Sequence, residues 1–340
     1  MTLPRIGISL GDPGGIGPEI ILKSFRRGDA LPVAKYVLFG SVSVLEREAR
    51  EIGLRPFWKA EDGGESDGVR LRECRLDEEP AVRRGPSAEN GRASFRYFEE
   101  AVAAAGRDEV DAIVTAPVSK ASWSLAGLPY RGHTEYLEGL FPGAIMSFWS
   151  SRLTVALLSH HRPLVEAVRF VRRDNIVRFL EILGTSLSRV RAGSREFLIA
   201  GLNPHAGEAG LLGTEEATEV GPAVEEARRR GMNIRGPLPP DVVFREALDR
   251  PERVVVALHH DQGLIPFKLV SFETGVNVTL GLPFVRTSPD HGTAFDIAGR
   301  NAADSRSLEE AIRLAAGLVV RPANAALDGK ARQTHNRRGV

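Results

Sequence analysis

Short apolar runs alternate with amphipathic stretches along almost the whole chain, and this alternation constrains the fold more than any other feature. The runs expected to form strands are residues 6–10, 36–40, 111–115, 144–149, 153–158, 197–202 and 254–258. The stretches expected to form helices are residues 18–25, 42–52, 87–105, 174–187, 215–230 and 308–319. Asp174 is expected to be an N-cap, residues 61–67 a polar loop, and the tail from Asp328 disordered. The alternation predicts an α/β protein with a mostly parallel sheet.

Length and composition exclude several functional classes. A chain of 340 residues is long for one compact core, so two lobes are expected. The net charge of +1 gives no electrostatic reason to expect a nucleic-acid or membrane partner. No apolar run approaches the ~18 residues of a membrane span, and the first residues do not resemble a signal peptide. The single cysteine, Cys74, excludes a disulfide framework and fits a reducing compartment, so we expect a cytoplasmic protein.

A cluster of polar residues follows the apolar run at residues 253–258. It consists of His259, His260, Asp261, Gln262 and, a few residues later, Lys268. Buried polar groups are costly unless they are paired or bind a ligand. Open α/β sheets bind their ligands at the carboxyl ends of the strands. The cluster therefore indicates part of an active site.

Histidines recur in the same kind of position. Seven of the eight lie in five short phrases with Gly or Pro at the ends of apolar runs, and His335 lies in a polar tail. The seven are His133, His160, His161, His205, His259, His260 and His291. Neutral imidazole is a common ligand of Zn²⁺, although each histidine taken singly also fits a hydrogen-bonded, half-buried side chain. Neighbours along a strand point to opposite faces, so one member of each doublet would join a given site, and spacing does not say which.

Two further phrases each allow two interpretations. Residues 11–19 join the first strand to its helix and are rich in glycine, which fits either a phosphate-binding loop or a tight turn with positive φ. They match neither the dinucleotide-binding nor the P-loop pattern. Residues 132–135 fit an active-site phrase, a helix capped by Thr134, or both. Lys268 and Arg286 stand inside apolar segments and are therefore candidates to bind a phosphate or carboxylate.

Taken together, these phrases resemble the 4-hydroxythreonine-4-phosphate dehydrogenase family, which makes a precursor of pyridoxal phosphate. The segments that carry the resemblance are residues 11–19, 115–120, 132–135, 201–208, 260–268 and 276–299. The resemblance extends from about residue 5 to about residue 327. Residues 291–299 are also similar to the adenine-side loop of isocitrate and isopropylmalate dehydrogenases, which bind a nicotinamide cofactor without a Rossmann motif.

The resemblance implies a fold and an assembly. The fold would be the two-lobed α/β architecture of isocitrate and isopropylmalate dehydrogenases, with a mostly parallel sheet. We expect a discontinuous cofactor-side lobe of residues 1–130 and 281–340, and a lobe of residues 131–280 that binds metal and substrate and forms the dimer. The active site would be shared between the two subunits of a homodimer.

The resemblance also implies roles for individual residues. The ligands of one divalent cation (Zn, Mg, Mn or Co) would be His161, His205 and His260. The substrate would contact His133, Thr134, Lys268, Asn277 and Arg286. NAD or NADP would bind at His291, Gly292, Thr293 and Asp296. Asp241 and Asp261, near the metal, and Lys268 would take part in catalysis.

The implied activity is a metal-dependent, NAD(P)-linked oxidation of 4-phosphooxy-threonine at its secondary alcohol, followed by decarboxylation to 3-amino-2-oxopropyl phosphate. Relatives of the family act on other compounds, so a four-carbon sugar-acid 4-phosphate and an aromatic cis-dihydrodiol acid are alternative substrates. Two alternatives belong to other classes. One is a transferase of the phosphate-acyltransferase type, and the other is a non-catalytic protein that binds a metal or an anion.

Overall fold

The computed structural model describes residues 3–26, 31–60, 68–81, 84–190 and 195–319. Its strands are β1 (Arg5–Ser9), β2 (Lys35–Gly40), β3 (Lys59–Ala60), β4 (Val69–Glu73), β5 (Ala112–Thr115), β6 (Ile145–Trp149), β7 (Thr154–Leu157), β8 (Glu196–Ala200), β9 (Ile234–Leu238), β10 (Arg253–Ala257), β11 (Val276–Leu280) and β12 (Val285–Pro289). Its helices are α1 (Gly17–Arg26), α2 (Val42–Glu51), α3 (Ala88–Gly106), α4 (Lys120–Leu125), α5 (His133–Leu140), α6 (Leu164–Phe170), α7 (Arg173–Val190), α8 (Gly221–Arg229), α9 (Val243–Ala247), α10 (His260–Ser271) and α11 (Arg306–Leu318). A 3₁₀ segment, η1 (Pro204–Gly210), and a π-helix, η2 (Glu216–Val220), precede α8.

The strands form one sheet in the order β3-β4-β2-β1-β5-β12-β11-β6-β7-β10-β8-β9. Antiparallel pairing occurs in its middle, between β12 and β11, β11 and β6, and β6 and β7. Toward both ends the described strands pair in parallel, which confirms the predicted α/β class with a mostly parallel sheet. Strands such as β5 and β10 are buried almost throughout, as expected for parallel strands covered by helices on both faces.

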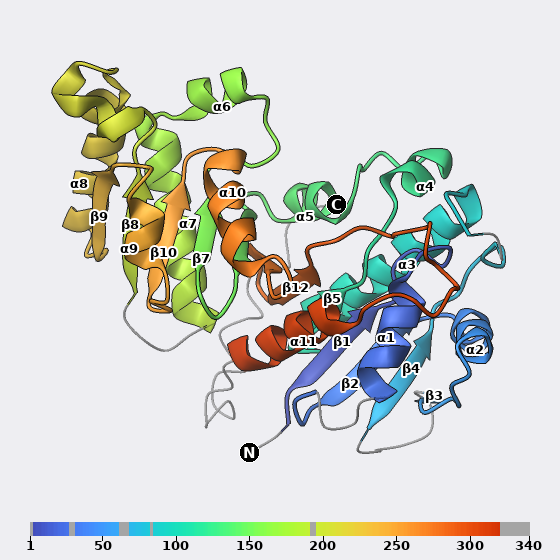
Figure 1. Cartoon of the computed structure of the whole chain (residues 1–340). Coiled ribbons are helices and arrows are strands. Elements are labelled where there is room, and N and C mark those ends of the chain that lie inside the picture. Colours follow the sequence, from blue (N-terminus) through green and yellow to red (C-terminus); the bar gives the residue numbers. More distant parts are fainter. Residues whose placement is uncertain (1–2, 27–30, 61–67, 82–83, 191–194, 320–340) are drawn as a thin grey trace, which may run out of the picture.

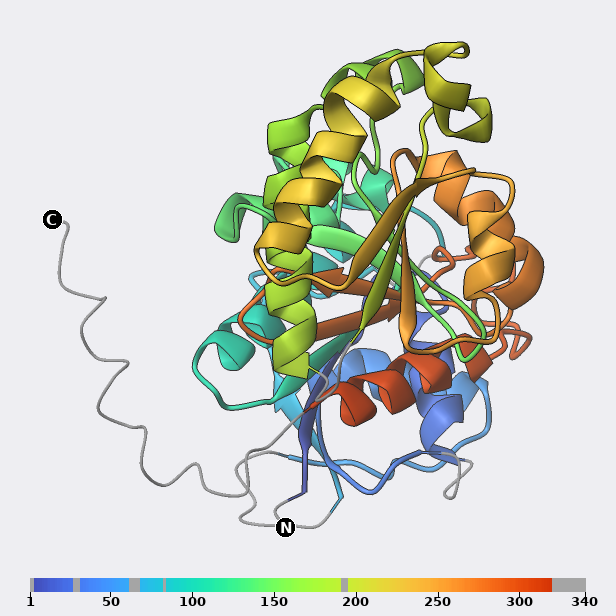
Figure 2. The same cartoon turned by 90° about the vertical axis from the view of Figure 1, so that its left-hand side faces the viewer.

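Helices cover both faces of each half of the sheet (Figure 1). In the half built on β1, helix α3 packs on one face, while α1 and α11 pack together on the other. In the other half, α7 and α8 lie on one face of β8 and β10, and α9 and α10 lie on the opposite face (Figure 2). One apolar cluster includes Ile6 of β1 as well as Leu183 of α7, so it runs through both halves, and a second cluster, which includes Val255 of β10 and Phe267 of α10, lies in the second half.

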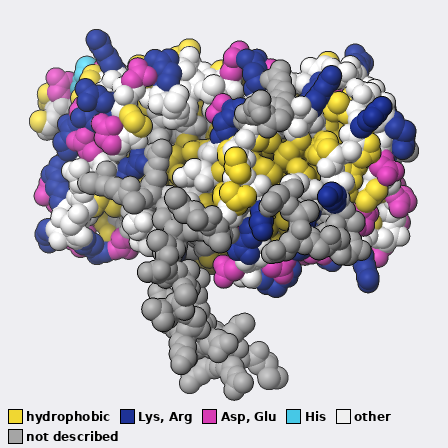
Figure 3. Space-filling model, turned by 90° about the horizontal axis from the view of Figure 1, so that it is seen from below, with side chains coloured by type: hydrophobic (Ala, Val, Ile, Leu, Met, Phe, Trp, Pro, Cys, Tyr) yellow, Lys and Arg dark blue, Asp and Glu magenta, His cyan; other side chains and the backbone are white. Residues whose placement is uncertain are grey.

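The face of the molecule seen from below has hydrophobic side chains near its centre, with Lys, Arg, Asp and Glu interspersed around them (Figure 3). Both signs of charge mix on this face, in line with the net charge of +1. Within the described ranges, every helix is too short or too polar to cross a membrane.

The structure corrects several local predictions. Asp174 is not an N-cap but lies in the first turn of α7. Thr134 is not a cap either, because α5 begins at His133 and its N-cap is Gly132. The helix expected at residues 215–230 begins as the π-helix η2 and continues as α8.

Other differences between prediction and structure concern whole strands and helices. The sequence analysis did not predict strands β3, β4, β9, β11 and β12, nor helices α4, α5, α6, α9 and α10. These helices are short or contain Gly and Pro, and β9 holds a Gly-Pro pair, so their periodicity is weak. The polar loop expected at residues 61–67 and the tail expected from Asp328 lie outside the described residues.

Candidate active site

A cavity of about 440 Å³ lies where the two halves of the sheet meet. Its walls come from the end of β5, the first turn of α5, helix α10 and strands β11 and β12, which converge in the middle of Figure 1. The predicted site residues that line it are His133, Thr134, His161, His260, Lys268, Asn277, Arg286, His291 and Gly292. Segments that are far apart in the sequence therefore come together at one place.

Arg286 is the buried charge of this cavity. Its side chain lies on β12 and is 2% exposed. The guanidinium donates to Thr279 Oγ1 at 3.0 Å, to Thr115 Oγ1 at 2.7 Å and to His133 Nδ1 at 3.2 Å, all neutral acceptors. Burial lowers the pKa of Arg286 to about 10, so the group remains a cation at neutral pH. Among the described residues it has no ion pair, and its Nε is buried without a partner. A buried cation without a counter-ion calls for an anionic ligand.

His133 is held in one tautomer by this arginine. Because a guanidinium can only donate, Nδ1 of His133 accepts, and the ring proton is on Nε2. Burial and the neighbouring Arg286 hold the pKa of His133 well below its usual value, so the ring stays neutral. Its Nε2 is buried and has no partner among the described residues. The Nε2–H is therefore a free donor at the cavity.

Further polar groups complete the lining. Two further buried atoms have no partner among the described residues: Oδ1 of Asn277 on β11 and Nε2 of His291. The ammonium of Lys268 on α10 lies 3.1 Å from the carboxylate of Asp290. The cavity thus holds a buried cation, a paired cation and free N–H donors, which suit a small anion, together with free acceptors on Asn277 and His291, which suit a hydroxyl or amino group.

His161 and His260 lie side by side at the cavity. Their ring centroids are 5.7 Å apart. Nδ1 of His260 is 2.7 Å from Asp261 Oδ1, and this contact lowers the pKa of Asp261. The hydrogen bond leaves Nε2 of His260 available, an arrangement typical of histidine ligands held by a carboxylate. Partial burial, and then the neighbouring His160, lower the pKa of His161, which favours the neutral form that binds metals. Neither histidine doublet lies in a strand, so the strand argument does not apply to them.

His205 lies outside the residues that line the cavity, in the 3₁₀ segment η1. Its φ is 52°, and positive φ continues as far as Gly210. Left-handed backbone costs roughly 1–2 kcal/mol per residue, so neighbouring contacts must hold the turn. The buried carboxylate of Glu216 does so, accepting from the backbone N–H groups of Leu202 at 2.8 Å and Asn203 at 2.7 Å. A strained turn that exposes an imidazole is a feature of functional sites.

The three predicted metal ligands do not form one cluster within a single chain. Among the described residues, no group of three His, Cys, Asp or Glu side chains comes close enough to hold a metal ion. One chain therefore contributes two adjacent imidazoles, His161 and His260, to this place. Asp241 lies in the exposed turn before α9, and neither it nor Asp261 lines the cavity.

The predicted cofactor segment continues from the cavity across the first half of the sheet. His291 and Gly292 line the cavity, whereas Thr293 and the exposed Asp296 lie beyond it. The backbone N–H of Ile16 donates to Thr293 O at 3.0 Å. This segment therefore rests on the glycine-rich turn that joins β1 to α1.

The glycine-rich turn is a tight turn and not a phosphate cradle. The N–H of Gly14 donates to Asp12 Oδ1 at 2.9 Å, and that of Gly15 donates to Asp12 O at 3.0 Å. These donors already have partners inside the protein. Gly11 has a φ of 72°, and a Cβ there would lie 2.4 Å from Pro117 O, so only glycine fits.

The sequence analysis missed the side chains that support the predicted ones. Thr115 and Thr279 hold Arg286, and Asp290 pairs with Lys268. Lys120, at the start of α4, also lines the cavity. A polar residue at the end of an apolar strand was the available signal for Thr115, but only the pairing of β5 with β12 brings it to Arg286.

Comparison with known proteins identifies the family to which this chain belongs. The model of the pyridoxal phosphate biosynthetic protein PdxA matches residues 32–315. The chain belongs to this family. It is 41% identical over 332 residues to a 4-hydroxythreonine-4-phosphate dehydrogenase from Aquifex aeolicus, covering 93% of this chain and 98% of the relative. It is 40% identical over 330 residues to a D-threonate 4-phosphate dehydrogenase from Cupriavidus necator, covering 94% and 99%.

A solved structure has the same architecture. The crystal structure of the 4-hydroxythreonine-4-phosphate dehydrogenase from Klebsiella pneumoniae matches with a TM-score of 0.83 and 37% identity, covering 93% of this chain and 98% of that one. The match confirms the predicted family and fold together. As a member of the PdxA family, the chain is a dehydrogenase-type enzyme.

We expect Arg286→Met to abolish the response of the PdxA-family protein to phosphate. Inorganic phosphate should stabilise the wild type, by about 2.7 kcal/mol at one hundred times its Kd, because it binds the folded state only. Thermal unfolding with and without phosphate measures this. The variant should lose the increase in Tm, while Arg189→Met, on the exposed face of α7, should keep it. An unchanged phosphate response in Arg286→Met would contradict the assignment of the anion site.

The neutral His133 predicts a pH dependence of stability. Its folded pKa lies below the unfolded value of 6.5, so the unfolded state takes up the proton first as pH falls. The contribution of His133 to the free energy of unfolding is fully present above pH 6.5. Below pH 6.5 it decreases by at most about 1.4 kcal/mol per pH unit. Urea unfolding at pH 7.5 and 5.5 measures the slope. His133→Asn should have a smaller slope than the wild type, and equal slopes would show that His133 is not held neutral.

Proposed function

We propose that this enzyme oxidises 4-phosphooxy-threonine at its secondary alcohol with NAD(P)⁺ and decarboxylates the product to 3-amino-2-oxopropyl phosphate. Oxidation moves a hydride to the cofactor and releases a proton. The resulting 3-oxo acid then loses carbon dioxide and takes up a proton at the neighbouring carbon. The observation that carries this proposal is the buried, unpaired Arg286 in a cavity lined by free polar groups, in a chain of the PdxA family.

The substrate would be held by the groups that lack protein partners. Arg286 would bind one anionic end of the substrate, with Lys268 beside it, while Oδ1 of Asn277 on the neighbouring strand would accept from a hydroxyl or amino group. His133 would donate from its Nε2–H, and Thr134 would add a hydroxyl. Because Arg286 is already fixed by two threonines and His133, it would bind the anion with little loss of side-chain entropy.

A divalent cation would be held by His161 and His260, with Asp261 orienting the second ring. When bound, such a cation lowers the pKa of an alcohol and stabilises negative charge on its oxygen. We propose that the third ligand, His205, comes from the partner subunit of a homodimer. The exposed apolar side chains of Ile265 and Leu269 on α10 support an interface there, beside the metal ligands. Asp241 would approach the same site in the dimer.

The nicotinamide cofactor, NAD or NADP, would bind along His291, Gly292, Thr293 and Asp296. The cavity at one end of this segment supports the proposal, since a hydride can pass only between groups in contact. The proposed lobes, residues 1–130 with 281–340 and residues 131–280, would then meet at the cavity. Cys74 is a free, buried thiol, which supports the proposed cytoplasmic location.

D-Threonate 4-phosphate is the second candidate substrate. A relative with this activity is almost as similar to the chain as the 4-hydroxythreonine-4-phosphate dehydrogenase from Aquifex aeolicus. The two compounds share a phosphate and a carboxylate and differ in an amino or hydroxyl group at carbon 2. An aromatic dihydrodiol acid without phosphate would leave Arg286 with less negative charge to bind, so it is less favoured.

Cofactor reduction tests the function directly. Purified enzyme with added Zn²⁺, Mg²⁺ or Mn²⁺ should reduce NAD⁺ or NADP⁺ with 4-phosphooxy-threonine and release carbon dioxide. D-Threonate and D-erythronate 4-phosphates and an aromatic dihydrodiol acid are the comparison substrates, ranked by kcat/KM. A chelator should remove the activity, and the metal should restore it. A higher kcat/KM for D-threonate 4-phosphate would select the second candidate, and no reduction with any substrate would refute the dehydrogenase proposal.

A mixing experiment tests the shared metal site. His161→Ala and His205→Ala should each be inactive as homodimers. If one subunit supplies His161 and the other His205, a mixed dimer has one intact site, and random reassociation should restore about one quarter of the wild-type activity. Mixing His161→Ala with His260→Ala is the control and should restore none. Failure of the first mixture, with mixed dimers demonstrated by mass, would place all three ligands in one subunit.

A further inference from the structure

The segment between the cavity and α11 is strained and needs to be held. Ala294 has a φ of 40°, Gly299 of 74° and Asn301 of 53°. A non-glycine residue in this region costs about 1 kcal/mol or more. Within the segment, the N–H of Ile297 donates to Ala294 O and the N–H of Arg300 donates to Ile297 O, both at 3.1 Å. Contacts with other elements must therefore fix its path across the top of the first half of the sheet (Figure 1).

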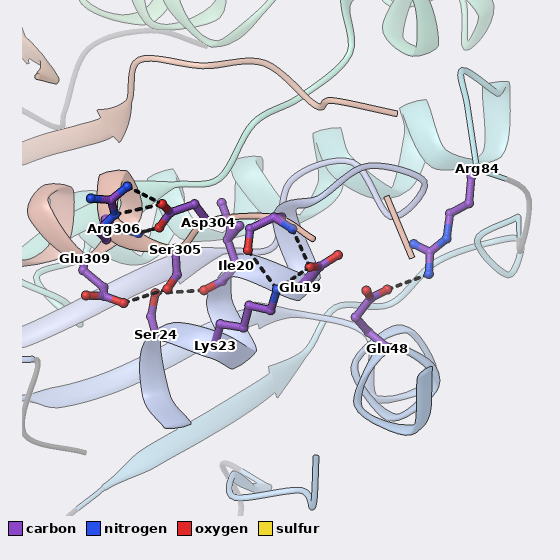
Figure 4. A network of polar contacts seen from close by, with 11 residues as sticks. Glu19, Ile20, Lys23, Ser24, Glu48, Arg84, Asp304, Ser305, Arg306 and Glu309 are labelled. Atoms are coloured by element: carbon purple, nitrogen blue, oxygen red, sulfur yellow. Dashed lines mark hydrogen bonds and ion pairs between the residues drawn. The ribbon is translucent and has the colours of Figure 1, made fainter. Parts of the chain in front are cut away.

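One such contact captures both backbone groups of a single residue. Glu19 and Lys23 are one turn apart on α1, and their side chains form an ion pair of 2.7 Å. The same Glu19 Oε1 accepts from the N–H of Ala303 at 2.8 Å, and Lys23 Nζ donates to Ala303 O at 2.8 Å. Figure 4 shows the pair pointing from α1 toward this segment. Glu19 is fully buried and Lys23 is 20% exposed, so the contact is shielded from water.

A second contact lies on the other side of α1. Arg84 pairs with Glu48 of α2 at 2.8 Å and also with Glu51. A Cβ on Gly299 would lie 2.7 Å from Arg84 Nε, so the backbone of the segment rests on this guanidinium. Thr293 rests on the glycine-rich turn in the same way, because a Cβ on Gly15 would lie 2.9 Å from it. Three points along the segment thus touch the first half of the sheet.

We infer that Glu19 and Lys23 are positioning residues that hold residues 291–303 in the conformation that binds the nicotinamide cofactor. The inference rests on the proposed function for the identity of the cofactor, but the contact itself does not depend on it. The negative Glu19 and the positive Lys23 lie one turn apart on α1 and bind the N–H and the C=O of Ala303, respectively. Together they fix both the position of Ala303 and the direction of the backbone there. Residues 11–19 therefore have a role in supporting residues 291–303, and they do not need to bind a phosphate to have it.

The test compares Glu19→Gln and Lys23→Met with a matched control. If the segment spends about nine tenths of its time displaced in a variant, the apparent Kd for the cofactor rises about tenfold. We expect KM for NAD(P)⁺ to rise accordingly, with kcat and KM for the phosphorylated substrate changed less than twofold. Lys23→Arg keeps the charge and has enough N–H donors for both bonds, to Glu19 and to Ala303 O, so it should retain most of the affinity. Glu46→Gln is the matched control, because it removes the same charge from an exposed i,i+4 pair on α2. It should leave the KM for NAD(P)⁺, the KM for the substrate and kcat unchanged.

Hydrogen exchange separates this inference from the proposed function. Amides of residues 291–303 should exchange faster in Glu19→Gln than in the wild type or in Glu46→Gln, without any cofactor present. Unchanged exchange and unchanged cofactor KM would overturn the inference. A parallel decrease in kcat, in the affinities for cofactor and substrate, and in Tm would mean that the Glu19–Lys23 pair serves general stability. That result would also overturn the inference. A wild type that reduces no nicotinamide would refute the function, while the exchange result would still decide whether Glu19 holds the segment.

Discussion

The burial of one positive charge without a counter-ion governs the site. Arg286 lies on a central strand, is fixed by Thr115, Thr279 and His133, and has no carboxylate partner among the described residues. In the absence of a ligand this arrangement is unfavourable, because desolvation of a guanidinium is only partly offset by neutral acceptors. The same arrangement is favourable once an anion enters. The site thus gives up stability in exchange for affinity, as binding sites commonly do.

The position of this charge follows from the sheet. The antiparallel strands β11 and β12 lie between two parallel halves, so Arg286 and Asn277 sit next to the end of β5 and close to α5 and α10. Each half alone provides part of the cavity wall. A change in the relation of the halves would therefore alter the distance between the anion-binding groups and the two adjacent imidazoles, His161 and His260.

Two strained segments contain residues of the proposed metal and cofactor sites, and each is held by a buried carboxylate. Glu216 binds the backbone before His205, and Glu19 binds Ala303 after the proposed cofactor residues. A carboxylate can accept several N–H groups at once, which suits it to fix irregular backbone that has no strand or helix partners. In both places the strain remains because surrounding contacts over-determine the conformation.

The sequence alone determined the fold class and the family. Apolar periodicity located seven strands and most of the long helices, because a buried strand or amphipathic helix leaves its period in neighbouring residues. The resemblance identified nine of the residues that line the cavity. Periodicity could not find short or Gly- and Pro-containing elements such as α10, nor correct the caps assigned to Asp174 and Thr134, since capping depends on where the helix begins in the folded chain.

Only the tertiary structure decided which groups are paired and which are free. It showed that the amides of the glycine-rich turn are already bonded, that Lys268 has Asp290 while Arg286 has no anion, and that His205 is apart from the other two histidines in one chain. Partners such as Thr115 and Arg286, or Glu19 and Ala303, are separated by more than a hundred residues. Local sequence carries no record of such pairs, because their meeting depends on strand order and on how the helices pack.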